Sequence, residues 1–204
     1  PYSVSPLEGL RNYLGGSAVI RYADGSDLDE AQALAAWADA VVVVAGYDHQ
    51  DEGEGRDRDS LSLHADEIEL IRTAAGENKA CAVVLVGGGA IMMEEWKDAV
   101  PGILMSWYGG MEGGAAVART LFGEANPGGK LPFTVPGRVQ DLPFFDRNAD
   151  TIEYDYYHGY TLFEKKAVKP AFPFGFGLSY TTFVCSSPKV TEEPDQLKVA
   201  VDVT

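Results

Sequence analysis

Residues 41–58, VVVVAGYDHQDEGEGRDR, place four consecutive valines directly before a loop that is rich in glycine and charged side chains. A short, continuous apolar run is typical of a strand that is buried on both faces, as in a parallel sheet. Open α/β sheets bind their ligands outside the carboxyl ends of their strands, so the loop that follows the valines is a candidate for chemistry.

Helix and strand patterns alternate on both sides of this stretch. The expected strands, besides residues 41–44, are residues 17–22 (SAVIRY), 80–86 and 102–107. The expected helices are residues 7–14, 28–40, 65–75 and 115–122, with a weaker helical pattern over 93–99. This alternation predicts an α/β fold with a mostly parallel sheet sandwiched between helices.

The pattern changes at about residue 132, after which prolines, aromatic residues and loops dominate. Residues 197–203 then alternate strictly between apolar and other side chains, which is typical of a half-buried antiparallel strand. Two strands cannot bury such a face by themselves. We therefore expect an α/β domain over residues 1–178 and the start of a truncated β-sandwich over residues 179–204. Since the chain begins at Pro1 and not at Met, we expect its natural N-terminus to be missing.

The composition excludes several classes of protein. Of the 204 residues, 46% are apolar, which is enough for a sizeable core. The 31 acidic side chains outnumber the 16 basic ones, and the net charge of -15 argues against nucleic-acid and membrane partners. The two cysteines, Cys81 and Cys185, form neither a disulfide framework nor a metal-binding spacing.

The charged loop contains the best candidate for chemistry, Glu54. It stands between two glycines, so the backbone can turn freely and the carboxylate can project into a cleft. Arg56 and Arg58 lie close enough in sequence to orient it, and Asp57 offers Arg58 a partner. Glu52 is too near in the same loop to serve as a fixed second carboxylate opposite Glu54. The alternative interpretation is a solvent-exposed loop of mixed charge, which is the usual role of such a segment.

Four motifs, in order along the chain, resemble those of glycoside hydrolase family 3, the β-glucosidase and β-xylosidase family. The segment EGRDR at residues 54–58, followed by LSL at 61–63, resembles the E-G-x-D-R…L-x-L signature. The other three are residues 107–114 (WYGGMEGG), 121–132 (LFGEANPGGKLP) and 173–183 (PFGFGLSYTTF). Residues 153–160 follow the family pattern only loosely, which affects the expected substrate preference.

This resemblance implies a retaining mechanism that is divided between two domains. In this family an Asp nucleophile lies in a TIM barrel, and the acid/base Glu comes from a second domain of the (α/β)6-sandwich type. The chain resembles that second domain and the start of a fibronectin-III-like third domain. Carried over by position, the acid/base is Glu54, and Asp57 with Arg58 matches a pair that positions the loop. The resemblance implies no cofactor and no metal.

The implied partners are a β-linked glucoside, xyloside or oligosaccharide and the TIM barrel of the same protein. Without that barrel the chain is expected to be inactive. Trp107 and Tyr108 are candidates for stacking on a sugar, although aromatic residues at a strand end equally often cover the core. We favour a periplasmic or secreted protein over a cytoplasmic one, and homo-oligomerisation stays open.

Two alternatives come from other classes of protein. A non-catalytic module that binds a carbohydrate or a nucleotide could use the same edge of the sheet. A structural domain could instead pack on a catalytic partner through its tyrosine-rich stretch at residues 154–160.

Overall fold

The computed structural model describes residues 2–55 and 58–204. Its centre is a parallel sheet of β1 (Val41–Gly46), β2 (Cys81–Val86) and β3 (Gly102–Met105), in the spatial order β1-β2-β3. Val41 pairs with Cys81, and Ala82 pairs with Gly102, so the carboxyl ends of all three strands lie at one edge of the sheet. The α/β prediction is confirmed.

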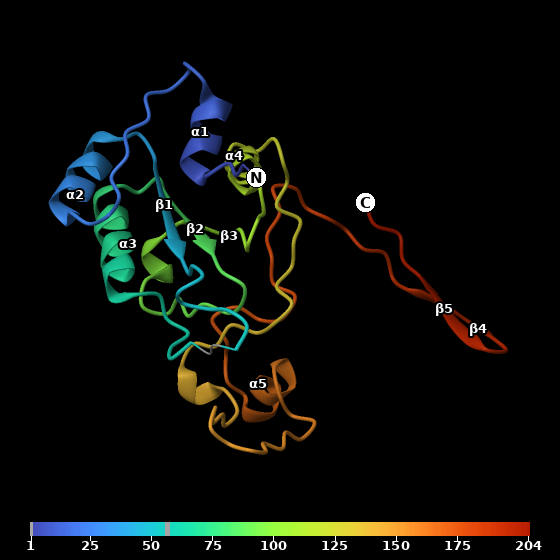
Figure 1. The fold of residues 1–204 in the computed structure, drawn as a ribbon. Helices are drawn as coiled ribbons and strands as arrows, with labels where there is room; N and C mark the ends of the chain where they lie inside the picture. The colour runs from blue at the N-terminus through green and yellow to red at the C-terminus, as the bar shows by residue number, and fades with distance from the viewer. Residues whose placement is uncertain (1, 56–57) are drawn as a thin grey trace.

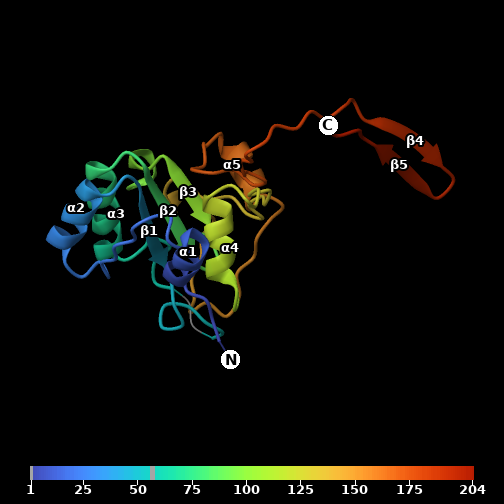
Figure 2. The ribbon, with the colours of Figure 1, turned by 90° about the horizontal axis from the view of Figure 1, so that it is seen from above.

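Helices cover both faces of the sheet (Figures 1 and 2). On one face lie α2 (Leu28–Trp37) and α3 (Ala65–Glu77), which pack on each other, and on the other α1 (Pro6–Leu14) packs on α4 (Gly113–Leu121). The remaining elements are the 3-10 turns η1 (Lys97–Ala99) and η2 (Val139–Asp141), helix α5 (Tyr160–Lys166), and strands β4 (Lys189–Glu193) and β5 (Gln196–Ala200).

The core is centred on β2, the middle strand of the sheet. Val83, Val84 and Leu85 are fully buried, and Ile71 of α3 packs into the same core without exposure to solvent. Continuous burial was also predicted for residues 41–44, and this is wrong for β1, since Val44 is 43% exposed. Val43 and Ala45 of the same strand are buried in the core, whereas the side chain of Val44 points to the opposite face of the sheet, where it is only partly covered.

Two other local predictions need correction. Residues 17–22 form no strand, and Val19 and Tyr22 within them are exposed. A β-rich composition forms a strand only where another strand can pair with it, and no described strand does so here. The weak helical pattern over 93–99 is reduced to the single 3-10 turn η1.

The C-terminal strands β4 and β5 pair antiparallel and form a ribbon that extends away from the rest of the molecule (Figures 1 and 2). The predicted strand over residues 197–203 corresponds to β5, which ends earlier, at Ala200, and is fully exposed and not half-buried, because nothing in the described chain covers its apolar face. Within the described residues, no helix is both long and apolar enough to cross a membrane.

Candidate active site

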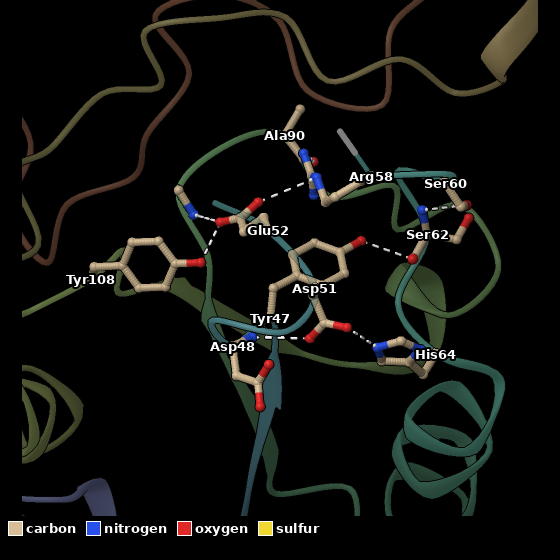
Figure 3. Close-up of polar contacts among 11 residues, drawn as sticks. Tyr47, Asp48, Asp51, Glu52, Arg58, Ser60, Ser62, His64, Ala90 and Tyr108 are labelled. Atoms are coloured by element: carbon tan, nitrogen blue, oxygen red, sulfur yellow. Dashed lines mark hydrogen bonds and ion pairs between the residues drawn. The ribbon is translucent and has the colours of Figure 1, made fainter. Parts of the chain in front are cut away.

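The loops that follow the three parallel strands meet at the carboxyl edge of the sheet. Residues 47–64 connect β1 to α3, residues 87–96 follow β2, and residues 106–112 lead from β3 into α4. Side chains and backbone groups from all three loops contact one another there (Figure 3). The loop that contains Glu54 is therefore held by its two neighbours in space.

The Glu52 carboxylate is the centre of these contacts. Its Oε1 accepts a 2.7 Å hydrogen bond from the backbone N–H of Gly88 and a second one from the Tyr108 hydroxyl. Its Oε2 lies 3.2 Å from Nε of Arg58. The two side chains of this ion pair are only 16% and 14% exposed, so water screens their attraction less than on an open surface. Gly88 permits the close approach, because a Cβ there would lie 3.0 Å from Oε1.

Arg58 is held by more than this ion pair. Its Nη2 donates a 3.0 Å hydrogen bond to the carbonyl oxygen of Ala90, and its guanidinium lies 4.5 Å from the centre of the Tyr47 ring. Tyr47 is itself buried and donates a 2.7 Å hydrogen bond to the carbonyl oxygen of Ser62. Arg58 thus joins Tyr47, at the start of the loop, to the segment after β2.

A second anchor lies on the other side of the loop. Oδ1 of Asp51 lies 2.7 Å from Nε2 of His64, and Oδ2 accepts a 3.0 Å hydrogen bond from the N–H of Asp48. Glu67 supports this side, since its carboxylate accepts hydrogen bonds from the N–H groups of Gly46, at the end of β1, and His64, before α3. Asp51 and Glu52 are neighbours in sequence, and Figure 3 shows their carboxylates directed to different sides of the loop.

Glu54 lies beyond these anchors and is exposed. Gly55, next to it, has a φ of +75°, a conformation that glycine adopts without strain. No described residue forms a hydrogen bond or ion pair with the Glu54 side chain. A carboxylate in this setting is accessible to a molecule that approaches the carboxyl edge of the sheet.

Trp107 and Tyr108 lie in the loop after β3. The Trp107 ring packs edge-on against Phe133, with 5.6 Å between the ring centres, and its φ is +56°. Tyr108 exposes part of its ring, while its hydroxyl points to Glu52 (Figure 3). Loss of solvation and the hydrogen bond to the Glu52 carboxylate raise the pKa of Tyr108 to about 12. Trp107 therefore contacts the body of the domain, and Tyr108 contacts the loop.

The structure changes the expected partners of the loop residues. Arg58 was predicted to orient Glu54, but it pairs with Glu52. Arg56 and Asp57 lie outside the described residues, so their predicted roles stay predictions. Sequence reasoning missed the contribution of Glu52, and the signal that could have indicated it is its position just before the glycine-flanked Glu54.

Residues 2–55 and 58–204 contain no group of three or more His, Cys, Asp or Glu that could hold a metal ion.

Comparisons with known proteins agree on one family. The chain matches the model of the glycosyl hydrolase family 3 C-terminal domain over residues 1–180. It is 41% identical to a β-xylosidase of Formosa agariphila over 199 residues, which cover 93% of this chain and 27% of that protein. It is 37% identical to a β-glucosidase of Bacteroides ovatus over 178 residues, which cover 82% of this chain and 24% of that protein.

A solved structure has the same fold over almost the whole chain. The family 3 β-glucosidase of Bifidobacterium adolescentis superposes with a TM-score of 0.86 at 31% identity. The match covers 99% of this chain and 32% of that protein. The chain therefore spans about a quarter to a third of the length of the proteins that it resembles.

Proposed function

Because this chain belongs to glycoside hydrolase family 3, as the C-terminal domain of that family, we propose that it supplies the general acid/base of a retaining β-glycosidase. The residue in that role is Glu54. The substrate is a β-linked glucoside, xyloside or oligosaccharide, in keeping with the β-xylosidase and β-glucosidases that the chain resembles.

The observation that carries this proposal is the setting of Glu54. Its carboxylate is exposed at the carboxyl edge of a parallel sheet, next to a glycine with positive φ. The preceding residues, Asp51 and Glu52, are anchored to other parts of the domain. A general acid needs both a defined position and access to its substrate, and this loop offers both.

In the proposed cycle, Glu54 donates its proton to the glycosidic oxygen while a second carboxylate attacks the anomeric carbon. A covalent glycosyl-enzyme forms and the leaving group departs with the proton. Glu54 then takes a proton from water, whose oxygen attacks the anomeric carbon and releases the sugar and the free nucleophile.

The nucleophile has to come from outside this domain. The two carboxyl groups of a retaining enzyme lie about 5 Å apart, on either side of the anomeric carbon. Glu52 cannot fill that position, since both of its oxygens are engaged with Gly88, Tyr108 and Arg58. We place the nucleophile, an Asp, in a TIM barrel of the same protein. The 204-residue chain by itself is then inactive, and residues 179–204 begin a fibronectin-III-like domain.

Substitution of Glu54 in the complete enzyme tests this assignment. With Glu54→Ala, hydrolysis of a disaccharide should fall by about 10²–10⁴-fold, the usual contribution of a general acid/base. Aryl glycosides with activated leaving groups need no proton, so their first step should be spared. Azide should then restore turnover by replacing the activated water, with a glycosyl azide as the product.

Glu69→Ala is the matched control, because Glu69 is an exposed glutamate of α3. This variant should hydrolyse both the disaccharide and the aryl glycosides at the wild-type rate. Near-normal disaccharide hydrolysis by Glu54→Ala would contradict the assignment. Ligand binding by the isolated chain that is insensitive to Glu54→Gln would instead favour a non-catalytic binding module.

A further inference from the structure

Glu52 connects all three loops at the carboxyl edge of the sheet. It receives hydrogen bonds from Gly88, in the loop after β2, and from Tyr108, in the loop after β3. Its ion pair with Arg58 joins it to a residue of its own loop, six residues further along the chain. This carboxylate stands two residues before Glu54.

The ion pair between Glu52 and Arg58 also closes the loop at its base. Glu54 lies in the segment between these two residues, so its backbone is tied on both sides by one contact. The 2.7 Å hydrogen bond from Gly88 then fixes the base of the loop to the sheet. Hydrogen bonds to an ionised group are stronger than those between neutral groups, and exclusion of water strengthens them further.

Such fixation matters for proton transfer. A displacement of about 1 Å can cost 10²-fold in rate, because the acid has to lie within hydrogen-bond reach of the leaving oxygen. Two glycines flank Glu54 and leave its immediate backbone free to turn. The position of Glu54 therefore depends on the residues just before and after that hinge.

We propose that Glu52 is a positioning residue for proton transfer by Glu54, acting through its contacts with Arg58, Gly88 and Tyr108. This inference rests on the proposed function of Glu54. Glu52 itself exchanges no proton with the substrate, and its two oxygens stay engaged as acceptors throughout the cycle. Tyr108 contributes from the loop after β3 as a hydrogen-bond donor, in addition to any contact of its ring with a sugar.

The effect can be measured in the complete enzyme through its dependence on the leaving group. With Glu52→Ala, kcat/KM for a disaccharide should fall by about 10–100-fold, while an activated aryl glycoside loses less than about threefold, since only the former needs the proton. The kcat/KM of Glu52→Gln for the disaccharide should lie between those of the wild type and Glu52→Ala, because a Gln amide oxygen can still accept hydrogen bonds from Gly88 and Tyr108. Glu69→Ala is again the matched control and should change neither value.

A double variant separates positioning from mere support of the fold. If Glu52 acts through Glu54, the variant Glu52→Ala/Glu54→Ala should hydrolyse the disaccharide no more slowly than Glu54→Ala alone. A purely structural role would lower the rate for both substrates by the same factor and would add to the loss caused by Glu54→Ala. Either of those results overturns the proposal.

Two further outcomes are distinguishable. If Glu54→Ala shows the dependence on the leaving group and Glu52→Ala does not, the positioning role is wrong and the proposed function stands. If Glu54→Ala shows no such dependence, the proposed function fails, and the positioning role fails with it. Should Glu52→Ala not fold, Tyr108→Phe removes one donor and keeps the ring. It should lower disaccharide hydrolysis more than aryl glycoside hydrolysis, and equal losses would count against the proposal.

Discussion

Asp51 and Glu52 anchor the same loop through different chemistry. Glu52 is paired with an arginine and lies largely out of solvent, whereas Asp51 is paired with His64, whose side chain is 57% exposed. Since histidine titrates near neutral pH, the contact of Asp51 with His64 changes with pH in that range.

The pKa values of His64 and Asp51 shift in opposite directions. The hydrogen bond to Asp51 raises the pKa of His64 above its usual 6.5. The N–H of Asp48, and secondly His64, lower the pKa of Asp51 below 3.8. The contribution of His64 to stability is therefore complete below pH 6.5 and is lost as the pH rises through its raised pKa. The contribution of Asp51 is present above pH 3.8 and is lost as the pH falls through its lowered pKa.

We predict that Asp51→Asn returns the pKa of His64 toward 6.5. The His64 ring signals in an NMR titration measure this directly, and His64→Gln assigns them. The free energy of unfolding of the wild type should decrease between pH 6 and pH 8 relative to that of Asp51→Asn. A His64 pKa that is the same in both proteins would show that the Asp51 contact does not hold the proton.

At the scale of the elements, the crossing of α1 and α4 depends on two glycines. A Cβ at Gly9 would lie 2.1 Å from the carbonyl oxygen of Gly114, and a Cβ at Gly114 would lie 2.1 Å from that of Ser5. The N–H of Gly114 donates a 3.1 Å hydrogen bond to the carbonyl oxygen of Val4, so backbone meets backbone at this point. Gly114, in one of the family motifs, thus contributes to packing as well as to the start of α4.

We predict that Gly114→Ala destabilises the domain by about 1–3 kcal/mol, the usual cost of overpacking, because the obstructing atoms are backbone atoms that cannot rotate away. The midpoint of thermal unfolding should fall by several degrees. Gly113→Ala is the matched control, since nothing lies within 4 Å of a Cβ at that position. It should be neutral or stabilising by up to about 1 kcal/mol, in line with helix propensity. Equal stability of the two variants would contradict this description of the crossing.

Sequence reasoning predicted the elements whose signal is local. The apolar run of β2 and the amphipathic pattern of α3 were both read correctly, within one or two residues at their ends. The prediction failed at residues 17–22, where strand formation depends on a partner that the sequence does not show. It also overestimated the burial of Val44, because a run of apolar side chains does not reveal which face of a strand is only partly covered.

The candidate site likewise has a part that the sequence predicts and a part that it does not. The position of Glu54 in an exposed loop after β1 could be predicted from the valines and the glycines. The contacts of Glu52 could not, because Gly88 and Tyr108 lie 36 and 56 residues away in sequence, and one of the donors is a backbone N–H. Only the parallel register of the three strands brings these groups together.

At the scale of the whole molecule, the chain is joined to the body of the domain as far as Tyr180. The Tyr180 hydroxyl donates a 2.8 Å hydrogen bond to the carbonyl oxygen of Thr120, and Asn126 contacts both Ser179 and Tyr180. Further along, the hydrogen bonds of the described residues join the ribbon only to itself, as between Val184 and Thr204. All residues of β4 and β5 are exposed, including Val190, Leu197 and Val199.

We therefore predict that deletion of residues 184–204 leaves the thermal unfolding midpoint of the remaining chain within about 2 °C of the original, because the deletion removes no contact with the core. Deletion of residues 178–204 is the informative comparison. It also removes the hydrogen bonds of Ser179 and Tyr180, and at about 1 kcal/mol for each hydrogen bond it should lower the midpoint by several degrees. Calorimetry of the three chains side by side measures both effects. A large loss of stability on the shorter deletion would mean that the ribbon contributes to the fold of the α/β domain, and the proposed boundary near residue 179 would then have to move toward the C-terminus.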